Sequence, residues 1–187
     1  MDIEGSLREL GPVDSGALIE AVLSQDEEAW KANQYRQQAY EVHTQTESLV
    51  MIFCDGWPEL TVTKESAWDA LKETAVPLMR RIIRDFYPAG GTVIRAMAAK
   101  LKAGGVISPH RDTHQSFTHS HRIHIPITTN PRVRFMINGR PHRFEVGKAY
   151  EINNQKNHSV MNSGDEDRIT FIFDYLPPKT DDQQPAQ

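Results

Sequence analysis

Disulfide frameworks and membrane spans are both missing from this sequence. Its one cysteine, Cys54, excludes an internal disulfide and any zinc module built from several cysteines, and it fits a reducing compartment. No apolar run approaches the ~18 residues that a membrane-spanning helix needs. The first residues are acidic, unlike a basic leader peptide. We therefore expect a cytoplasmic protein without a membrane partner.

An excess of charge of one sign is also missing. The 21 Lys and Arg residues nearly balance the 25 Asp and Glu residues, which gives a net charge of -4 at pH 7. Because no overall positive field draws the chain onto phosphate backbones, we expect no nucleic acid partner. Hydrophobic residues make up 39% of the 187 residues, which is enough for one globular domain.

Histidine is what the composition holds in excess. Seven of the eight histidines lie in the 49 residues from 110 to 158, where an even spread would place about two. They are His110, His114, His119, His121, His124, His142 and His158. For any one of them a surface loop is the simpler explanation, so spacing has to separate the functional histidines from the rest.

The first part of the chain, residues 1–90, predicts a helical support. Residues 15–38 fit one amphipathic helix, and residues 68–86 carry apolar side chains at steps of three and four, the spacing of one helical face. Pro77 interrupts the second run, which predicts either a kink or two helices with Thr74 capping the second. The apolar run at residues 49–53 fits a buried strand.

From residue 91 the hydrophobic period shortens toward two, which predicts short strands. The expected strands are 93–101, 106–108, 123–127, 132–137, 143–146, 149–152, 158–161 and 169–175. Asn138 and Gly139 predict a type I′ hairpin. Since the gaps are too short for crossover helices, we expect a mainly β fold. Its core, residues 91–178, would be a cupin-like double-stranded β-helix (jelly roll), followed by a flexible tail over residues 179–187.

An imidazole and a carboxylate lie two positions apart at His110 and Asp112, so on a strand both point to one face and can reach one ion. His158, 46 positions after Asp112, opens an apolar run and would supply a third ligand. Two histidines and a carboxylate on one side of an octahedral metal form the facial triad of non-haem Fe(II) oxygenases. We predict these three as the metal-binding, catalytic residues.

Arg168 lies ten residues beyond His158, with Thr170 on the same face of the predicted strand. A buried guanidinium needs a partner and matches a carboxylate through two charge-assisted hydrogen bonds, to which a hydroxyl can add a third. That partner could be Glu151 or Asp174 of this chain. It could also be the far carboxylate of a cosubstrate such as 2-oxoglutarate, whose keto-acid end would chelate the metal.

A further pair, Arg122 and His124, shares one strand face. If this face points into the barrel, the pair could hold a second carboxylate of cosubstrate or substrate. If it points outward, both side chains are solvated. We favour the inward orientation, because Ile123 and Ile125 occupy the opposite face and sandwich strands are often buried on both sides.

Taken together, these residues bring the segment from about residue 90 to 178 close to a known family. The matching stretches are Pro109-His110, Arg122 to Ile127, Gly147 to Asn153, His158 to Val160, and Arg168 with Phe173-Asp174. In this ordered set the chain resembles the aspartyl/asparaginyl β-hydroxylases, dioxygenases that depend on Fe(II) and 2-oxoglutarate. The resemblance implies that His110 and His158 bind the metal and that Arg168 anchors 2-oxoglutarate, with Arg122 and His124 contacting cosubstrate or substrate.

The aspartate at position 112 differs from the pattern of the vertebrate members of that family. Their site resembles a two-histidine site in which a small residue stands at the carboxylate position. The presence of Asp112 makes the site resemble the three-ligand triad of the wider 2-oxoglutarate oxygenase superfamily. We therefore expect hydroxylation of a C–H bond in an amino acid or a peptide residue, with O2 consumed and succinate and CO2 released. Two alternatives stay open: a cupin-type metalloenzyme without 2-oxoglutarate, and a barrel that binds a small carboxylate without catalysis.

The remaining candidates carry less weight. His114 shares the parity of His110 and Asp112 and could touch substrate, although residues 113–120 fit a mobile loop. His119, His121 and His142 are expected to be exposed. Asn153 and Asn154 could orient His158 or simply form a turn. Cys54 is expected to be a small buried hydrophobe.

Overall fold

The computed structural model describes residues 1–33 and 45–178 of the chain, in eleven strands and four helices. The strands are β1 (Leu7–Pro12), β2 (Thr46–Asp55), β3 (Thr61–Lys64), β4 (Thr92–Leu101), β5 (Val106–His110), β6 (His121–Thr128), β7 (Val133–Ile137), β8 (Arg140–His142), β9 (Lys148–Ile152), β10 (His158–Asn162) and β11 (Arg168–Leu176). The helices are α1 (Gly16–Leu23), α2 (Glu27–Lys31), α4 (Trp68–Phe86) and α5 (Ser116–His119).

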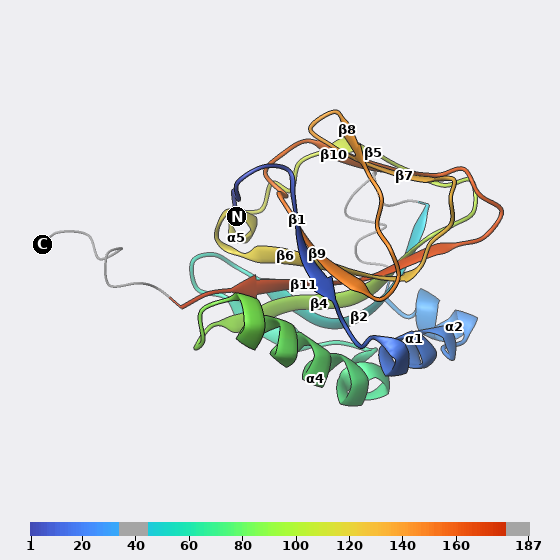
Figure 1. Cartoon of the computed structure of the whole chain (residues 1–187). Helices are drawn as coiled ribbons and strands as arrows, with labels where there is room; N and C mark the ends of the chain where they lie inside the picture. Colours follow the sequence, from blue (N-terminus) through green and yellow to red (C-terminus); the bar gives the residue numbers. More distant parts are fainter. Residues whose placement is uncertain (34–44, 179–187) are drawn as a thin grey trace, which may run out of the picture.

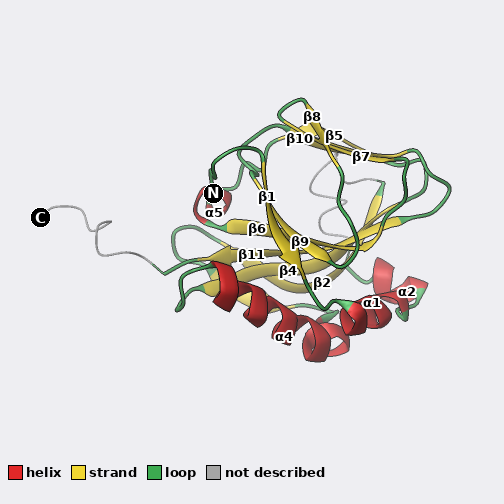
Figure 2. Ribbon diagram, viewed as in Figure 1, coloured by secondary structure: helices red, strands yellow, loops and turns green. Residues whose placement is uncertain are grey.

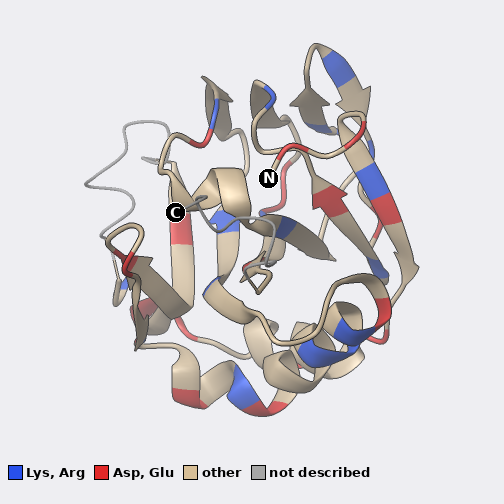
Figure 3. Ribbon diagram, turned by 90° about the vertical axis from the view of Figure 1, so that its left-hand side faces the viewer, with Lys and Arg blue, Asp and Glu red and all other residues tan. Residues whose placement is uncertain are grey.

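Two antiparallel sheets face each other, and α1 and α4 cover the outer face of the larger one (Figures 1 and 2). The larger sheet has seven strands in the order β1-β9-β6-β11-β4-β2-β3, and the smaller has four in the order β5-β10-β7-β8. The fold is mainly β and is the predicted jelly roll. Figure 3 shows ribbon segments of both charges, Lys and Arg in blue and Asp and Glu in red, spread over the fold. No helix among the described residues is long and apolar enough to cross a membrane.

Helix α4 is a single helix that continues through Pro77. It buries five residues at helical spacing, namely Leu71, Ala75, Leu78, Met79 and Ile82. Burial of each large aliphatic side chain contributes about 1.5–3 kcal/mol, which outweighs the hydrogen bond that proline cannot donate. Thr74 caps no second helix, because its hydroxyl donates to the carbonyl of Leu71 within the same helix.

Three expectations about local structure were wrong. The helix predicted over residues 15–38 is two helices, because Asp26 accepts from the Ala29 N–H at 2.8 Å and starts α2. The strand predicted at residues 143–146 lies instead at Arg140–His142, directly after Asn138 and Gly139, whose φ angles of 50° and 75° suit the predicted type I′ turn. Before residue 90 only the strand at residues 49–53 was expected; it lies within β2 and is confirmed, but β1 and β3 also join the larger sheet. Residues 34–38 of the predicted helix and the predicted tail lie outside the described residues.

Alternation along β6 and β11 separates apolar from polar side chains. One face packs with α1 and α4 in a core that includes Ile123, Ile125, Phe171 and Phe173. The other face carries the polar residues Arg122, His124, Arg168, Thr170 and Asp174. A second core of Phe135, Ile137, Phe144, Tyr150 and Val160 packs beside this face. The larger sheet therefore presents its buried polar groups to the space between the sheets.

Candidate functional site

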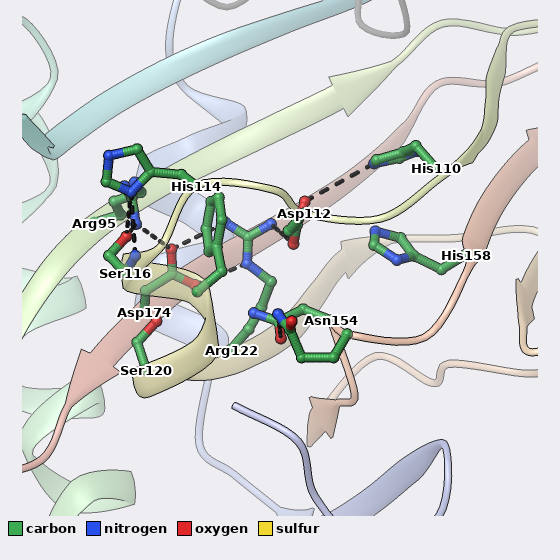
Figure 4. Close-up of polar contacts among 12 residues, drawn as sticks. Arg95, His110, Asp112, His114, Ser116, Ser120, Arg122, Asn154, His158 and Asp174 are labelled. Carbon is green, nitrogen blue, oxygen red and sulfur yellow. Dashed lines mark hydrogen bonds and ion pairs between the residues drawn. The ribbon is translucent and has the colours of Figure 1, made fainter. Parts of the chain in front are cut away.

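The three predicted metal ligands come together at one end of the smaller sheet. His110 and His158 are direct cross-strand partners on β5 and β10, with ring centroids 4.4 Å apart. Asp112 follows β5, and its Oδ1 lies 4.0 Å from Nε2 of His110. One ligand atom from each residue lies within 4.8 Å of the others, and Figure 4 shows the three side chains facing a common point. One ion can therefore reach all three.

Both imidazoles are held in the form that a metal ion requires. Nδ1–H of His110 donates to the carbonyl of Ser108 at 2.8 Å, and Nδ1–H of His158 donates to the carbonyl of Lys156 at 3.0 Å. With the proton on Nδ1, each ring has its lone pair on Nε2. Burial lowers the pKa of His158 and favours its neutral form, despite the opposing charge of Asp112. The donor set of two neutral imidazoles and a carboxylate fits Fe(II).

Arg122 connects the metal-ligating carboxylate to a second, deeper one. Its Nη1 donates to Asp112 Oδ2 at 2.8 Å, while Nε and Nη2 donate to the two oxygens of Asp174 at 2.8 and 2.9 Å. Asp174 on β11 lies in register with Arg122 on β6 and with Arg95 on β4, whose Nη1 is 3.5 Å from Asp174 Oδ2. Asp174 is fully buried. Burial alone would raise its pKa, but the two arginines hold it below its usual range.

The segment between Asp112 and β6 packs against the same arginines. Ser116 accepts from Nη1 of Arg95 at 2.9 Å, and Phe117 has the guanidinium carbons of Arg95 and Arg122 at 4.3 and 4.4 Å from its ring centre. The predicted loop over residues 113–120 thus includes the short helix α5. His114, whose Nδ1 lies 2.8 Å from Ser116 Oγ, sits on the far side of this network from the metal ligands (Figure 4).

Arg168 is a buried cation whose surroundings hold no counter-charge. It is 5% exposed, and among the described residues it has neither an ion pair nor a hydrogen bond. Burial lowers its pKa to about 10. Thr170, on the same face of β11, is also buried, and its Oγ1 has no hydrogen-bond partner in the described part of the chain.

The internal ion-pair alternatives for Arg168 were wrong, because both carboxylates are engaged elsewhere. Asp174 is bound by Arg122 and Arg95. Glu151, which is 1% exposed, is bound by Tyr87 OH at 3.0 Å and by His121, with Arg8 at 3.7 Å.

A cavity of about 370 Å³ opens beside Arg168. Its wall includes Pro126, Phe135, His142, Arg143, Phe144 and Arg168. The ring centre of Phe135 is 5.6 Å from the guanidinium carbon of Arg168 on one side and 6.4 Å from the ring of His158 on the other. Phe135, a residue of the cavity wall, is therefore a near neighbour of both Arg168 and the predicted metal ligand His158.

Arg122 and His124 both lie inside the molecule, the orientation that we favoured. The side chain of Arg122 is 12% exposed, and His124 is buried with its ring edge-on to Phe135 and Phe144 at 5.8 and 6.0 Å. The guanidinium of Arg122 already contacts two carboxylates of this chain. A contact of either residue with cosubstrate or substrate stays a prediction.

Several of the lesser candidates have other roles. Asn153 donates to Asp2 and to the carbonyls of residues 3 and 5, so it anchors the first residues rather than His158. Asn154 supports the site through its main chain, since its carbonyl accepts from the Asp112 N–H at 3.4 Å.

Of the three histidines expected to be exposed, His119 is exposed and stacks on Trp57, with ring centres 4.8 Å apart. His121 is half-buried on Glu151, and His142 is half-buried in the cavity wall. Cys54 is buried, as predicted.

The residues missed by sequence reasoning are Arg95, Tyr87 and Ser116. Each touches a buried carboxylate or its arginine from a distant element, namely β4, the segment after α4, and α5. The spacing of residues along a single strand contains no signal for such contacts.

Comparison with known proteins decides the family. A family model described as aspartyl/asparaginyl beta-hydroxylase matches residues 19–178, which is most of the chain. The chain belongs to this family. The resemblance noted in the sequence is thereby confirmed, and the family match extends into the helical part, where the sequence alone gave none. No curated protein matches this aspartyl/asparaginyl β-hydroxylase family member in sequence.

Solved structures of low sequence identity share its fold. An oxidoreductase of the 2OG-Fe(II) oxygenase family from Burkholderia pseudomallei is 12% identical, with a TM-score of 0.56 over 93% of this chain and 97% of that one. The nickel complex of the non-haem monooxygenase ThoJ is 13% identical, with a TM-score of 0.58 over 93% and 74%. EvdMO1 is 12% identical, with a TM-score of 0.58 over 93% and 48%.

Proposed function

We propose that this member of the aspartyl/asparaginyl β-hydroxylase family is a dioxygenase dependent on Fe(II) and 2-oxoglutarate. It would hydroxylate a C–H bond of an amino acid or of a residue in a peptide. One atom of O2 enters the product and the other enters succinate, which forms with CO2 from 2-oxoglutarate. The observation that carries the proposal is Arg168, which is buried, has no ion pair among the described residues, and lines a cavity together with Phe135, whose ring lies 6.4 Å from that of His158.

An unpaired guanidinium inside a protein is costly unless a ligand supplies the counter-charge. The far carboxylate of 2-oxoglutarate would do so by accepting two parallel hydrogen bonds from Arg168. Thr170 lies on the same strand face, its buried hydroxyl has no partner among the described residues, and it would donate a third hydrogen bond. A cavity of about 370 Å³ has room for a ligand of this size.

The metal would be held by His110, Asp112 and His158, and when bound it supplies the redox chemistry that activates O2. The chain's own contribution is placement. The carbonyls of Ser108 and Lys156 fix the imidazole rings, and Arg122 fixes the carboxylate. These contacts are all supplied by the chain itself, and they would hold the three ligand groups in place around an ion.

Aromatic side chains would keep water out of the reaction space. Phe135 stacks on Phe144, and Phe144 stacks on Tyr150, with ring centres 4.7 and 4.6 Å apart. This stack lines the space between the sheets beside His124 and Arg168. Exclusion of water there would strengthen the contact of Arg168 with a bound carboxylate.

We also propose the kind of partner and the setting. The balanced charge of the chain supports a small amino acid or peptide rather than nucleic acid or membrane as the partner. The single, buried Cys54 supports a cytoplasmic setting.

Anaerobic titration with Fe(II) and 2-oxoglutarate tests the proposal directly. We expect a visible charge-transfer band that requires both additions and is lost in Arg168→Met. The control is Arg143→Met, because Arg143 lines the same cavity but is exposed. The charge-transfer band should remain in this variant. No band in the wild-type protein, or an unchanged band in Arg168→Met, would refute the proposal.

Turnover separates the proposed reaction from its alternatives. Amino acids and peptides are screened in air for succinate release coupled to the gain of one oxygen atom in the substrate. Oxidation without succinate would indicate a cupin-type enzyme that needs no cosubstrate. Binding of 2-oxoglutarate without turnover of any substrate would indicate a carboxylate-binding barrel.

A further inference from the structure

We infer that Arg122 is a positioning residue of the metal site, which restricts Asp112 to one metal-binding oxygen, and that it is not a ligand of the cosubstrate. The inference rests on the proposed function, because it assumes that His110, Asp112 and His158 hold the metal. It departs from the role that the family resemblance implies for Arg122.

The two oxygens of Asp112 face different partners. Oδ2 accepts a hydrogen bond of 2.8 Å from Nη1 of Arg122, whereas Oδ1 lies on the side of His110, 4.0 Å from its Nε2 (Figure 4). The carboxylate is only 10% exposed, so water does not compete strongly for either oxygen. Turning Oδ2 toward the metal would break the charge-assisted bond to Arg122.

The number of coordination positions gives this restriction a chemical purpose. An octahedral ion bound by two imidazoles and one carboxylate oxygen keeps three positions, which suffice for a chelating keto acid and O2. A carboxylate bound through both oxygens would take one of these positions. By holding Oδ2, Arg122 keeps that position open.

Arg122 is itself held firmly enough to act in this way. Asp174 takes two parallel hydrogen bonds from it and is fully buried, and Phe117 covers the guanidinium plane. The three nitrogens of the guanidinium are thus all engaged by carboxylates of this chain. If Arg122 swung toward a ligand, it would leave Asp112 and withdraw its charge from Asp174.

The two buried arginines of the site therefore have different roles. Arg122 bridges two carboxylates, whereas Arg168 has no ion pair among the described residues and faces the cavity. A cosubstrate carboxylate would meet no competing anion at Arg168. At Arg122 the cosubstrate carboxylate would have to displace Asp112 or Asp174.

The chain offers a matched control in Arg95. Like Arg122, it contacts Asp174 and stacks on Phe117, but it does not touch Asp112. Lysine at either position keeps the positive charge and loses the planar fork. Any general effect of disturbing the buried charges should appear in both variants, whereas an effect transmitted through Asp112 should appear only in Arg122→Lys.

The experiment titrates anaerobic protein with Co(II) and records the ligand-field spectrum, which reports coordination geometry. We expect Arg122→Lys to bind Co(II) about 10–100-fold more weakly, with an altered spectrum, as for loss of other contacts behind metal ligands. Arg95→Lys should match the wild-type protein in both its affinity for Co(II) and its ligand-field spectrum. With Co(II) at saturation, Arg122→Lys should keep 2-oxoglutarate binding but with weakened affinity, because Asp112 could then compete for one metal position through its second oxygen, whereas Arg168→Met should lose the binding.

Circular dichroism establishes that each variant is folded. If Arg122→Lys does not fold, Arg122→Gln, which keeps an amide donor, takes its place. If wild-type protein binds no Co(II), or His158→Ala binds it equally well, the proposed function fails. If the wild-type site binds Co(II) and the Arg122 variant matches it, or Arg95→Lys loses as much as Arg122→Lys, the positioning role fails. Loss of 2-oxoglutarate binding in Co(II)-loaded Arg122→Lys with an unchanged ligand-field spectrum would assign Arg122 to the cosubstrate instead.

Discussion

Replacing Arg168 by methionine should stabilise the ligand-free protein while destroying its affinity for 2-oxoglutarate. Methionine has a similar length but no charge, so it fills the same space. The guanidinium is 5% exposed and has no ion pair among the described residues, so in the absence of ligand its charge is a net cost to folding. The two effects of the substitution therefore have opposite signs.

The size of the stabilisation follows from the pKa of Arg168. Burial lowers this pKa from the ordinary value of an arginine to about 10, with no opposing contribution from a nearby acid. Since one pKa unit corresponds to about 1.4 kcal/mol, keeping the charge there costs about 3 kcal/mol. We expect the free energy of unfolding of Arg168→Met to rise by as much as that amount. Loss of two charge-assisted hydrogen bonds, each worth about 1.5–3 kcal/mol, should weaken 2-oxoglutarate binding at least a hundredfold.

Urea unfolding of the apoprotein and calorimetric titration of the Fe(II)-loaded protein under nitrogen measure the two effects. Arg95→Met is the matched control, because Arg95 is equally buried but paired with Asp174 and Ser116. It should lose about 1–3 kcal/mol of stability. If Arg168→Met were destabilised to the same extent as Arg95→Met, Arg168 would have a partner within the folded chain and the reasoning would be refuted.

Three further predictions concern the buried polar groups. Arg122 and Arg95 keep the folded pKa of Asp174 below the unfolded value of ~3.9, so its carboxylate stabilises the fold above that pH and this contribution is lost as pH falls through the folded pKa. Asp174→Asn should flatten the dependence of the urea midpoint on pH below about pH 4. Tyr87→Phe removes the hydrogen bond to buried Glu151 and should cost about 1–3 kcal/mol in urea unfolding. Thr170→Val should leave stability unchanged or slightly higher and weaken 2-oxoglutarate about tenfold in calorimetry, because its hydroxyl has no partner among the described residues.

Each of these has a result that contradicts it. An unchanged pH profile in Asp174→Asn would mean that its carboxylate is not held ionised by the arginines. Wild-type stability in Tyr87→Phe would mean that Glu151 is satisfied without the phenol. A large loss of stability in Thr170→Val would mean that the hydroxyl serves the fold rather than a ligand.

Side-chain parity was enough to predict much of the site. Arg168 and Thr170 lie two positions apart on β11, and alternation places them on one face regardless of how strands are ordered. His110 and Asp112 have the same spacing, and their side chains approach each other although Asp112 lies just beyond the end of β5. The same rule put Ile123 and Ile125 against the helices. What the structure added was that the two pairs share one interior.

Register could not be predicted in this way. Asp174 meets Arg122 and Arg95 because β11 lies between β6 and β4 and pairs with both at that residue. A shift by one residue would turn Asp174 to the other face relative to both arginines. Such pairing depends on contacts between segments far apart in the sequence, so Arg95 gave no sign of its role and Asp174 was considered only as a partner for Arg168.

Local sequence also concealed part of the fold. The segment of β1 includes Gly11 and Pro12, which are typical of turns, yet it pairs with β9 at the edge of the larger sheet. The apparent helix over residues 15–38 has a capping aspartate, Asp26, in its middle, and this signal was outweighed by the apolar spacing. Pairing with β9, a tertiary contact, decides the structure of β1, whereas a local cap decides where α2 begins.

The direct pairing of His110 with His158 gives the metal centre a mechanical role. Within the described part of the chain, β5 is an edge strand that pairs with β10 alone in the smaller sheet, so these backbone hydrogen bonds hold it from one side. An ion bound by both rings would act as a cross-link between the two strands at a single rung of the ladder. Loading the site would therefore suppress local opening of Val106–His110, and the strand that carries a metal ligand would be the one that the metal itself secures.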